Sequence, residues 1–366
     1  MTYLDNAATS FPKPKCVIRE VNRCIKTYCG NPGRGSHSMS LKAAEEIYKV
    51  RETVARHIGA EEIENIVFTP NATYALNLAI KTLIEPNCHV LCSDFEHNAV
   101  IRPLNRMARE RGITYSLCNG FADFETKIQG DTKAIVCSIA SNVTGEAISI
   151  DELSKIAIRN NLKLIIDASQ AVGHKKIELS KTHCDAFCAP GHKSLFGIQG
   201  SGFVYLNQLQ RNESFIEGGS GFDSRSPDMP RLLPEAYEAG TLSTPSIVSL
   251  GRGIEYIESV GVDNINAHVS LLTTRLADML SCHKEITIYG HGNGIVSFNV
   301  GELSSTDVSA FLNDKGICVR GGLHCAPAVH SRLGTLSQGT VRASFSYFNS
   351  KRDVDKLYRA IKEIIK

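Results

Sequence analysis

Short apolar runs alternate with helical patterns through the first two thirds of the chain. Five apolar or β-branched runs occupy residues 88–93, 113–118, 133–141, 163–169 and 200–206, and helical patterns such as residues 98–111 and 151–161 separate them. Nearly continuous apolar strands that alternate with helices are typical of a mostly parallel sheet covered on both faces. The sequence therefore predicts an α/β domain whose ligands bind at the carboxyl ends of the strands.

The pattern changes after a stretch rich in glycine and proline, residues 215–246. Beyond it, four further strand-like runs accompany helical patterns that include residues 263–281 and 351–365. A chain of 366 residues exceeds the usual size of one domain. We expect three parts: an extended N-terminal segment (1–14) packing near the small domain, a large domain (15–245), and a small α/β domain (246–366).

Charge and cysteine content exclude several classes of protein. The 40 basic and 38 acidic residues leave a net charge of +2 with no block of like charge, so neither nucleic acid nor a membrane surface is an expected partner. No apolar run is long enough to span a bilayer, and no signal-peptide pattern follows Met1. The twelve cysteines include no C-x-x-C pair, which favours reduced core thiols. We expect a soluble cytoplasmic protein that binds small molecules.

The stretch from Leu164 to Gly202 contains residues suited to a planar, charged cofactor. Asp167 ends an apolar run, and Lys193 stands in a glycine-punctuated turn directly after His192. Enzymes that use pyridoxal 5'-phosphate (PLP) need a lysine for the Schiff base and a carboxylate opposite the pyridine nitrogen. Lys193 and Asp167 fit these roles, although an isolated aspartate at this place is more often a helix N-cap.

Two further residues could contact such a cofactor. His97, in SDFEHNAV, could stack on the ring and assist proton transfer, or it could be a surface histidine at a helix start. Thr73 lies at the start of a predicted helix, where free backbone N–H groups and the helix dipole favour an anion such as phosphate. The simpler interpretation of Thr73 is a capping residue.

Cys325 differs from the other cysteines because it lies in the polar loop VRGGLHCAPAVHS, with Arg320, His324 and His330 nearby in sequence. Cationic neighbours and exposure lower the pKa of a thiol and favour a nucleophilic cysteine. A metal site formed by His324, Cys325 and His330 is a weaker hypothesis, because no fourth ligand is evident. Arg342, near the end of a predicted strand, could bind a substrate carboxylate in a bidentate manner or could pair with an acid at the surface.

Taken together and in order, these motifs resemble those of one known family. The motifs are YLDNAATSFPKP, RGSHSMS, NAT, EHNAVIRP, SNVTGE, DASQAVGH, GHKSLFGIQGSG, EAGTLSTPS, RGGLHCAP and VRASFSYFN. They cover nearly the whole chain and resemble the cysteine desulfurases with the class V aminotransferase fold. The loop RGGLHCA is similar to the group that includes SufS-type and CsdA-type desulfurases and selenocysteine lyase-like proteins.

The resemblance implies a fold, a cofactor and residue roles. The fold would be the PLP-dependent transferase fold of aspartate aminotransferase, with a large, mostly parallel seven-stranded sheet and a smaller α/β domain. Lys193 would hold PLP, Asp167 would pair with its pyridine nitrogen, and His97 would stack on its ring. The other implied cofactor contacts are Gln170 at the phenolic oxygen, Thr73, His192 and the backbone of Ala72 at the phosphate, Asn142, and Thr241 from the neighbouring subunit of a homodimer.

The resemblance also implies a reaction. Asn142 and Arg342 would hold the carboxylate of the substrate, and Arg320 would shape the mouth of the pocket. Cys325 would take sulfur from L-cysteine as a persulfide and pass it to an acceptor, which could be a protein, while alanine leaves. L-selenocysteine and cysteine sulfinate remain alternative substrates, and a non-catalytic thiol- or metal-binding protein is a third hypothesis.

Two positions depart from the family pattern. Pro190 stands where relatives usually have a hydroxyl residue before Gly-His-Lys, and Ala72 gives no hydroxyl beside Thr73. We therefore expect a contact to the phosphate to be lost or replaced by water.

Overall fold

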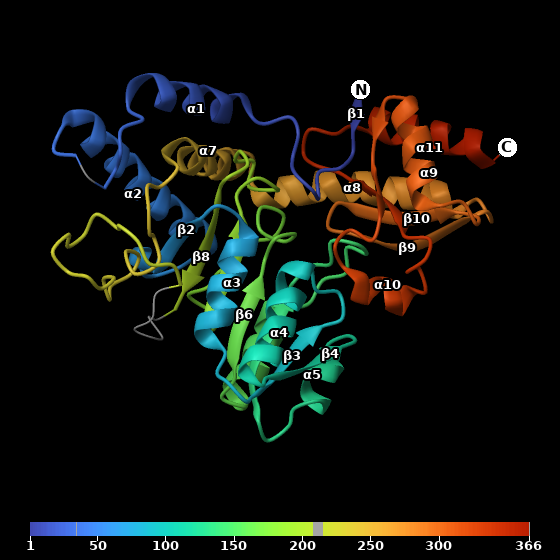
Figure 1. The fold of residues 1–366 in the computed structure, drawn as a ribbon. Helices are drawn as coiled ribbons and strands as arrows, with labels where there is room; N and C mark the ends of the chain where they lie inside the picture. Colours follow the sequence, from blue (N-terminus) through green and yellow to red (C-terminus); the bar gives the residue numbers. More distant parts are fainter. Residues whose placement is uncertain (34, 208–214, 366) are drawn as a thin grey trace.

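A seven-stranded sheet forms the centre of the molecule (Figure 1), and the computed structural model describes residues 1–33, 35–207 and 215–365. The strand order is β2-β8-β7-β6-β5-β3-β4, and only β8 runs antiparallel to its neighbours within this sheet. The predicted α/β class and the mostly parallel seven-stranded sheet are confirmed. The strands are β2 (Ile66–Thr69), β3 (His89–Ser93), β4 (Thr114–Cys118), β5 (Thr132–Ser138), β6 (Lys163–Asp167), β7 (Ala186–Pro190) and β8 (Gly202–Leu206).

Helices cover both faces of this sheet because its strands alternate two sets of apolar side chains. On one face, Val90, Val136 and Ile165 pack with residues of α3 and α4, and on the other face Leu91 and Ile135 pack with α2 and α6. Figure 1 shows α3 and α4 in front of the sheet. The helices are α1 (Lys15–Thr27), α2 (Ser38–Ile58), α3 (Ala72–Leu83), α4 (Asn98–Arg111), α5 (Ala122–Thr126) and α6 (Ile150–Arg159), with a 3-10 turn η1 at Ile63–Asn65.

A second, antiparallel sheet of order β12-β13-β10-β9 lies beside the first and carries the C-terminal helices (Figure 1). The N-terminal strand β1 (Thr2–Tyr3) pairs in parallel with β11 (Ile317–Cys318), so the start of the chain is joined to its C-terminal part. The other elements are α7 (Thr244–Val260), α8 (Val262–Ser281), β9 (Ile286–Gly292), β10 (Ile295–Val300), α9 (Ser305–Asp314), β12 (Arg320–Gly322), α10 (Pro327–Leu333), β13 (Thr340–Ser344) and α11 (Lys351–Ile365).

The predicted domain limits remain a prediction. Helix α7, which the limit at residue 246 divides, packs against α1 and α2, whereas α8 packs against β9 and α11. The N-terminal segment 1–14 contacts the smaller sheet through the pairing of β1 with β11 and a bridge between Asp5 and Ser344.

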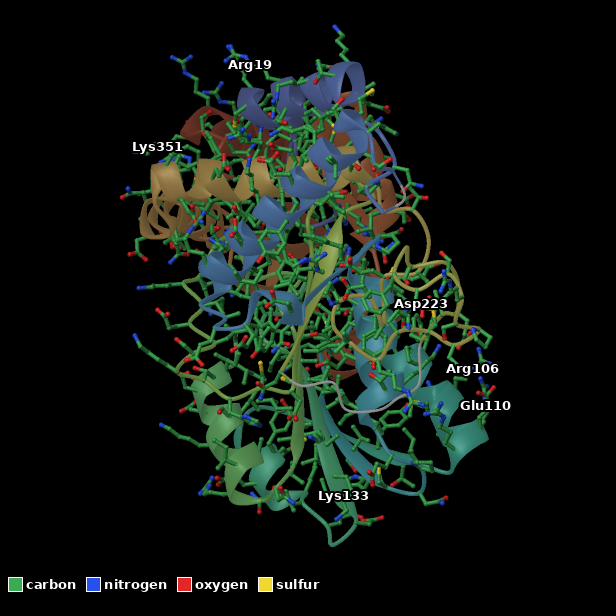
Figure 2. All side chains as sticks on the ribbon, turned by 90° about the vertical axis from the view of Figure 1, so that its left-hand side faces the viewer. Arg19, Arg106, Glu110, Lys133, Asp223 and Lys351 are labelled. Atoms are coloured by element: carbon green, nitrogen blue, oxygen red, sulfur yellow. The ribbon has the colours of Figure 1, made fainter. Side chains whose placement is uncertain are left out.

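Charged side chains lie around the outside of the molecule. Arg19, Lys133 and Lys351 are exposed at its rim, and Arg106 pairs with Glu110 on the outer face of α4 (Figure 2). Across the described ranges, no helix combines the length and the apolar character needed to cross a membrane.

Gly253 on α7 lets that helix approach the turn that follows Lys193. A Cβ atom at this position would collide with the carbonyl oxygen of Leu195 and lie 3.1 Å from the backbone nitrogen of Gly197. We expect Gly253→Ala to lower the free energy of unfolding by about 1–3 kcal/mol, because backbone atoms cannot give way as a side chain can. Denaturant unfolding measures this, with Gly130→Ala as the control because its Cβ would meet nothing within 4 Å. If Gly253→Ala and Gly130→Ala were equally stable, the close approach of α7 to this turn would not limit the size of the residue at position 253.

Candidate active site

A pocket lies at the carboxyl ends of β3, β5, β6 and β7, where the sequence predicts ligands. Parallel strands end at the same edge of a sheet, so residues distant in sequence meet there. The predicted site residues that line this pocket are Ala72, Thr73, His97, Asn142, Asp167, Gln170, His192, Lys193, Arg320 and Arg342. Cys325 and Thr241 are not among its lining residues.

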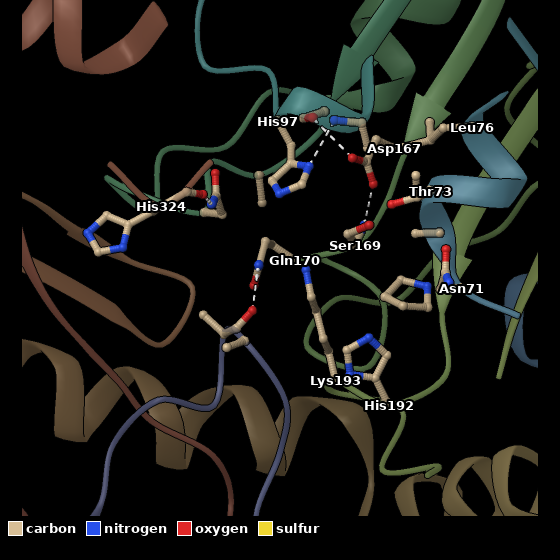
Figure 3. A pocket seen from close by; sticks show the side chains of 18 of the residues that line it. Asn71, Thr73, Leu76, His97, Asp167, Ser169, Gln170, His192, Lys193 and His324 are labelled. Atoms are coloured by element: carbon tan, nitrogen blue, oxygen red, sulfur yellow. Dashed lines mark hydrogen bonds between the residues drawn. The ribbon is translucent and has the colours of Figure 1, made fainter. Parts of the chain in front are cut away.

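Lys193 projects its amine into this pocket from the turn after β7, toward Gln170 and Ser169 (Figure 3). No hydrogen bond to the amine is found among the described residues. Burial lowers the pKa of Lys193 from 10.5 to about 8, and the Asp167 carboxylate opposes this effect. About a tenth of the amine is therefore neutral at pH 7, far more than for an exposed lysine, and the neutral amine is the form that attacks a carbonyl group.

The N-terminal segment fastens the turn that carries Lys193. The carbonyl oxygen of His192 accepts hydrogen bonds from the backbone N–H of Ser10 at 3.1 Å and from the Lys13 amine at 2.8 Å. The Ser10 hydroxyl also donates to the carbonyl oxygen of Lys193 at 2.8 Å. The position of Lys193 in the pocket thus depends on residues at the start of the chain.

Asp167 ends β6 and is 4% exposed. Its Oδ1 accepts a hydrogen bond from the backbone N–H of Ser169 at 2.9 Å, and the Ser138 hydroxyl lies 3.4 Å from Oδ2. No helix begins after Asp167 in this part of the described chain, so the aspartate is not a helix N-cap. A buried carboxylate at the pocket wall suits a cationic ring nitrogen.

The N-terminus of α3 forms the anion-binding end of the pocket. Asn71 is the N-cap and accepts a hydrogen bond from the backbone N–H of Tyr74, so Thr73 is not the cap and its hydroxyl is left for a ligand. His192 Nδ1 is buried and has no hydrogen-bond partner among the described residues. An orphaned imidazole nitrogen, free N–H groups and a helix dipole fit a phosphate group.

His97 caps helix α4 and also lines the pocket (Figure 3). Its Nδ1 accepts a hydrogen bond from the backbone N–H of Ala99 at 3.0 Å, so the ring proton lies on Nε2. Burial, reinforced by the charge of Lys193, lowers the pKa of His97 to about 4. The ring is neutral at physiological pH and has one N–H to donate.

The cationic side of the pocket is formed by Arg342 on β13, which is 1% exposed. Its Nη2 pairs with Asp5 Oδ1 at 2.9 Å, its Nη1 donates to the carbonyl oxygen of Asn142, and its Nε is buried without a partner among the described residues. The Asn142 amide donates to the carbonyl oxygen of His324. Arg342 is thus held in place by two of its five N–H donors, and the Nε–H is among those left for a substrate carboxylate.

Cys325 is exposed at the end of a constrained turn. His324 and Cys325 both have positive φ angles, 50° and 59°, which are uncommon outside glycine. The Cys325 carbonyl oxygen accepts from the backbone N–H of Asn98 at 2.7 Å, and Arg320 Nη2 lies 3.7 Å from Cys325 Sγ. The thiol is therefore accessible, beside a cation, and on a backbone fixed from two sides.

His324 and His330 do not form a metal site with Cys325 in this structure. His324 Nε2 lies 3.0 Å from the carbonyl oxygen of Thr340, and His330 Nδ1 bonds the hydroxyl of Thr335. No cluster of three or more histidine, cysteine, aspartate or glutamate side chains able to hold a metal occurs within the described ranges.

Thr241 lies outside the pocket of its own chain. It is exposed, and its hydroxyl accepts a hydrogen bond from the Asn31 amide at 3.2 Å.

Ser138 lines the pocket, and Asp5 and Glu96 support residues that line it, but the sequence-based prediction missed all three. Asp5 pairs with Arg342, the Ser138 hydroxyl lies 3.4 Å from Asp167 Oδ2, and Glu96 is hydrogen-bonded to Ser138. Two of the three could have been found from the sequence. Glu96 directly precedes the predicted residue His97, and Ser138 is the last residue of a strand, β5. Asp5 gave no such signal, because its partner is far away in sequence.

The fold and the pocket define a class of protein, and comparison with known families agrees. The model of the family Aminotransferase class-V matches residues 2–357, so the chain belongs to this family. Its relatives place it within the cysteine desulfurases. A probable cysteine desulfurase of Pyrococcus abyssi is 33% identical over all of this chain and 94% of the relative, and a cysteine desulfurase of Serratia proteamaculans is 31% identical over 100% and 94%.

Solved structures give the same result. The apo structure of the cysteine desulfurase from Thermococcus onnurineus NA1 has a TM-score of 0.93 and 32% identity, over 99% of this chain and 94% of that chain. The cysteine desulfurase CsdA from Escherichia coli has a TM-score of 0.89 at 23% identity, over 99% and 94%, which supports the fold alone. The resemblance stated from the sequence motifs is thus confirmed.

Proposed function

We propose that this chain is a PLP-dependent cysteine desulfurase that converts L-cysteine to L-alanine and keeps the sulfur on Cys325. The single observation that carries the proposal is the unbonded Lys193 amine, which shares a pocket with the buried Asp167 carboxylate. This combination suits a cofactor with an aldehyde and a protonated ring nitrogen. The exposed Cys325 thiol at 3.7 Å from Arg320, a lining residue of that pocket, supplies the nucleophile.

The residues present fit PLP at each of its ends. Asp167 would pair with the pyridine nitrogen, and Gln170, whose amide already donates to the carbonyl oxygen of Ala7, has a second N–H for the phenolic oxygen. His97 would lie against the ring. Thr73, the backbone N–H of Ala72 and His192 would hold the phosphate, with water in place of the hydroxyl that Pro190 lacks.

When it is bound, PLP supplies an electron sink for the pair released at the substrate Cα. Arg342, held by Asp5 and by the backbone of Asn142, would orient the substrate carboxylate together with Asn142. Lys193, whose pKa near 8 allows it to accept and return a proton, would take the Cα proton. His97 Nε2–H is placed to donate within the same pocket.

Cys325 would then take the sulfur atom. Its thiolate attacks the substrate sulfur, so that an S–S bond forms and the substrate Cβ–S bond breaks. The electron pair of the broken bond stays on Cβ, which takes up a proton and becomes the methyl group of alanine. Cys325 keeps the sulfur as a persulfide and passes it to an acceptor, for which its exposure leaves room.

The experiment that tests this proposal compares L-cysteine, L-selenocysteine and cysteine sulfinate side by side and measures alanine. Alanine release from cysteine, with sulfide appearing only when a reductant is present, supports a desulfurase. Alanine from selenocysteine or cysteine sulfinate alone would replace it with a lyase or desulfinase on the same scaffold. Absence of alanine with all three would favour the thiol-binding alternative.

A homodimer and a reducing compartment complete the proposal. The exposed Thr241 would reach the phosphate of the neighbouring subunit, which makes two shared sites. All twelve cysteines are free thiols, as expected for a protein of the cytoplasm.

The lowered pKa of Lys193 predicts how cofactor capture depends on pH. Only the neutral amine attacks the PLP aldehyde, so capture by the cofactor-free protein should speed up as the pH rises toward 8 and level off above it. His97 and His192 both have pKa values near 4 and stay neutral over this range. Rapid-mixing absorbance measures the rate of PLP capture. The control is the reaction of PLP with a free lysine side chain, whose pKa is about 10.4. A rate that keeps rising to pH 10 would contradict the prediction.

A further inference from the structure

Glu96 is a fully buried carboxyl group (0% exposed) directly before His97. Its Oε1 accepts hydrogen bonds from the Ser93 hydroxyl and from the backbone N–H of Ser138, the latter at 2.7 Å. Its Oε2 lies 2.7 Å from the Ser138 hydroxyl. No lysine, arginine or histidine forms an ion pair with it within the described part of the chain. An unpaired buried carboxylate is costly, so such groups take up a proton or serve a function.

Ser138 connects Glu96 to the acid of the cofactor site. Strand β5 lies between β3 and β6, and its last residue, Ser138, pairs in register with Asp167 at the end of β6. The Ser138 hydroxyl thus lies between two carboxyl groups, at 2.7 Å from Glu96 Oε2 and 3.4 Å from Asp167 Oδ2. No other side chain is hydrogen-bonded to Asp167 among the described residues.

The protonation state of Glu96 decides whether the Ser138 hydroxyl can donate a hydrogen bond to Asp167. A serine hydroxyl has one hydrogen, so it can donate to Glu96 or to Asp167 but not to both. If Glu96 is ionised, the hydrogen goes to the nearer Glu96 and Asp167 Oδ2 is left without a donor. If Glu96 is protonated at Oε2, it donates to Ser138, and the hydroxyl hydrogen turns to Asp167.

Burial favours the protonated arrangement. Removal from water, together with the charge of Asp167, raises the pKa of Glu96 to about 7 against the effect of its hydrogen bonds to Ser93 and Ser138, so the protonated form is populated at neutral pH, where an exposed glutamate is ionised. The ionised form would place a carboxylate on either side of the Ser138 hydroxyl, in a buried region where like charges are unfavourable.

We propose that Glu96 is a positioning residue, acting as a neutral acid that orients the Asp167 carboxylate toward the cofactor ring through the Ser138 hydroxyl. This inference rests on the proposed use of PLP. It assigns no contact between Glu96 and the substrate or cofactor.

A purely structural role makes different predictions. If Glu96 only held residues 93–97 against β5, PLP affinity would depend on its bonds to Ser93 and to the Ser138 backbone. The loss of the Ser138 hydroxyl would then leave that affinity unchanged. Glutamine can reproduce the neutral acid, because its oxygen accepts from Ser93 and the Ser138 N–H while its amide donates to the Ser138 hydroxyl.

The test is the affinity of the full-length protein for PLP, measured by titrating the visible absorbance of the bound cofactor in four variants. We expect Ser138→Ala to raise the Kd about 3–10-fold, as for the loss of one buried hydrogen bond. Glu96→Ala should raise the Kd by a smaller factor, because the Ser138 hydroxyl keeps its hydrogen but loses the donor that fixes its direction, and Glu96→Gln should stay within about twofold of the wild type. In the double variant, Glu96→Ala should add little to Ser138→Ala, because Glu96 acts on Asp167 only through that hydroxyl.

Each other outcome has a defined meaning. A wild-type affinity in Ser138→Ala, or a loss in Glu96→Gln as large as in Ser138→Ala, overturns the inference even if Glu96→Ala does not fold. If the losses of PLP affinity from Ser138→Ala and Glu96→Ala add in the double variant, the inference is overturned, and Glu96 only holds residues 93–97 against β5. A wild-type protein that binds no PLP overturns the proposed function itself, and the inference falls with it.

Discussion

Replacing Cys325 by serine is expected to lower sulfur release from L-cysteine on the order of 10³-fold or more, as for the loss of a catalytic nucleophile. The serine hydroxyl cannot form a persulfide, because it has no sulfur atom to bond the transferred sulfur. PLP binding should survive, because Cys325 does not line the pocket. Sulfide and alanine assays, together with the visible absorbance of the cofactor, measure both results.

Another exposed cysteine provides the control for this variant. Cys282 lies just beyond α8 and is also free and exposed, so Cys282→Ser should leave desulfuration unchanged. Activity on L-selenocysteine is expected to depend less on Cys325. If Cys325→Ser desulfurates cysteine at the wild-type rate, a persulfide on Cys325 is not part of the reaction.

Replacing Lys193 by alanine is the second change with a large expected effect. It removes the only amine that points into the pocket among its lining residues, so the visible absorbance of the covalently attached cofactor should disappear. Alanine formation should fall by about 10²–10⁴-fold or more, because the group that would move the Cα proton is also lost. Absorbance and alanine assays on the same protein sample separate the two losses.

Lys176→Ala is the matched control, because its side chain is 78% exposed and, among the described residues, forms an ion pair only with Glu178. This variant should keep both the absorbance and the activity. A Lys193→Ala protein that retained full alanine formation would show that this amine is not the attachment point.

The strands of the large sheet could be predicted from the sequence because their apolar runs alternate with amphipathic helices. Strand β7 was missed, since the chain between β6 and β7, residues 168–185, makes turns and no helix, so the alternation breaks there. The short helices α5 and α10 were also missed, because one or two turns give too little periodicity to detect.

The meeting of Lys193 and Asp167 in one pocket could be predicted because both follow buried strands of the same sheet, and their roles toward PLP stay a prediction. The sequence could not show that Asp5 pairs with Arg342 or that Ser138 lies between Glu96 and Asp167, since both contacts depend on strand order. The sequence also gave Thr73 as a possible cap, whereas Asn71 caps α3 and leaves the Thr73 hydroxyl for a ligand.

The central claim is that sulfur moves from cysteine to Cys325. The most direct measurement is a single turnover with sulfur-labelled L-cysteine in the absence of a reductant, followed by mass analysis of the peptide that contains Cys325. The proposed mechanism predicts one labelled sulfur atom on Cys325 for each alanine released, and none on Cys29 or Cys282, the other exposed cysteines. Alanine released with no label on Cys325 would contradict it.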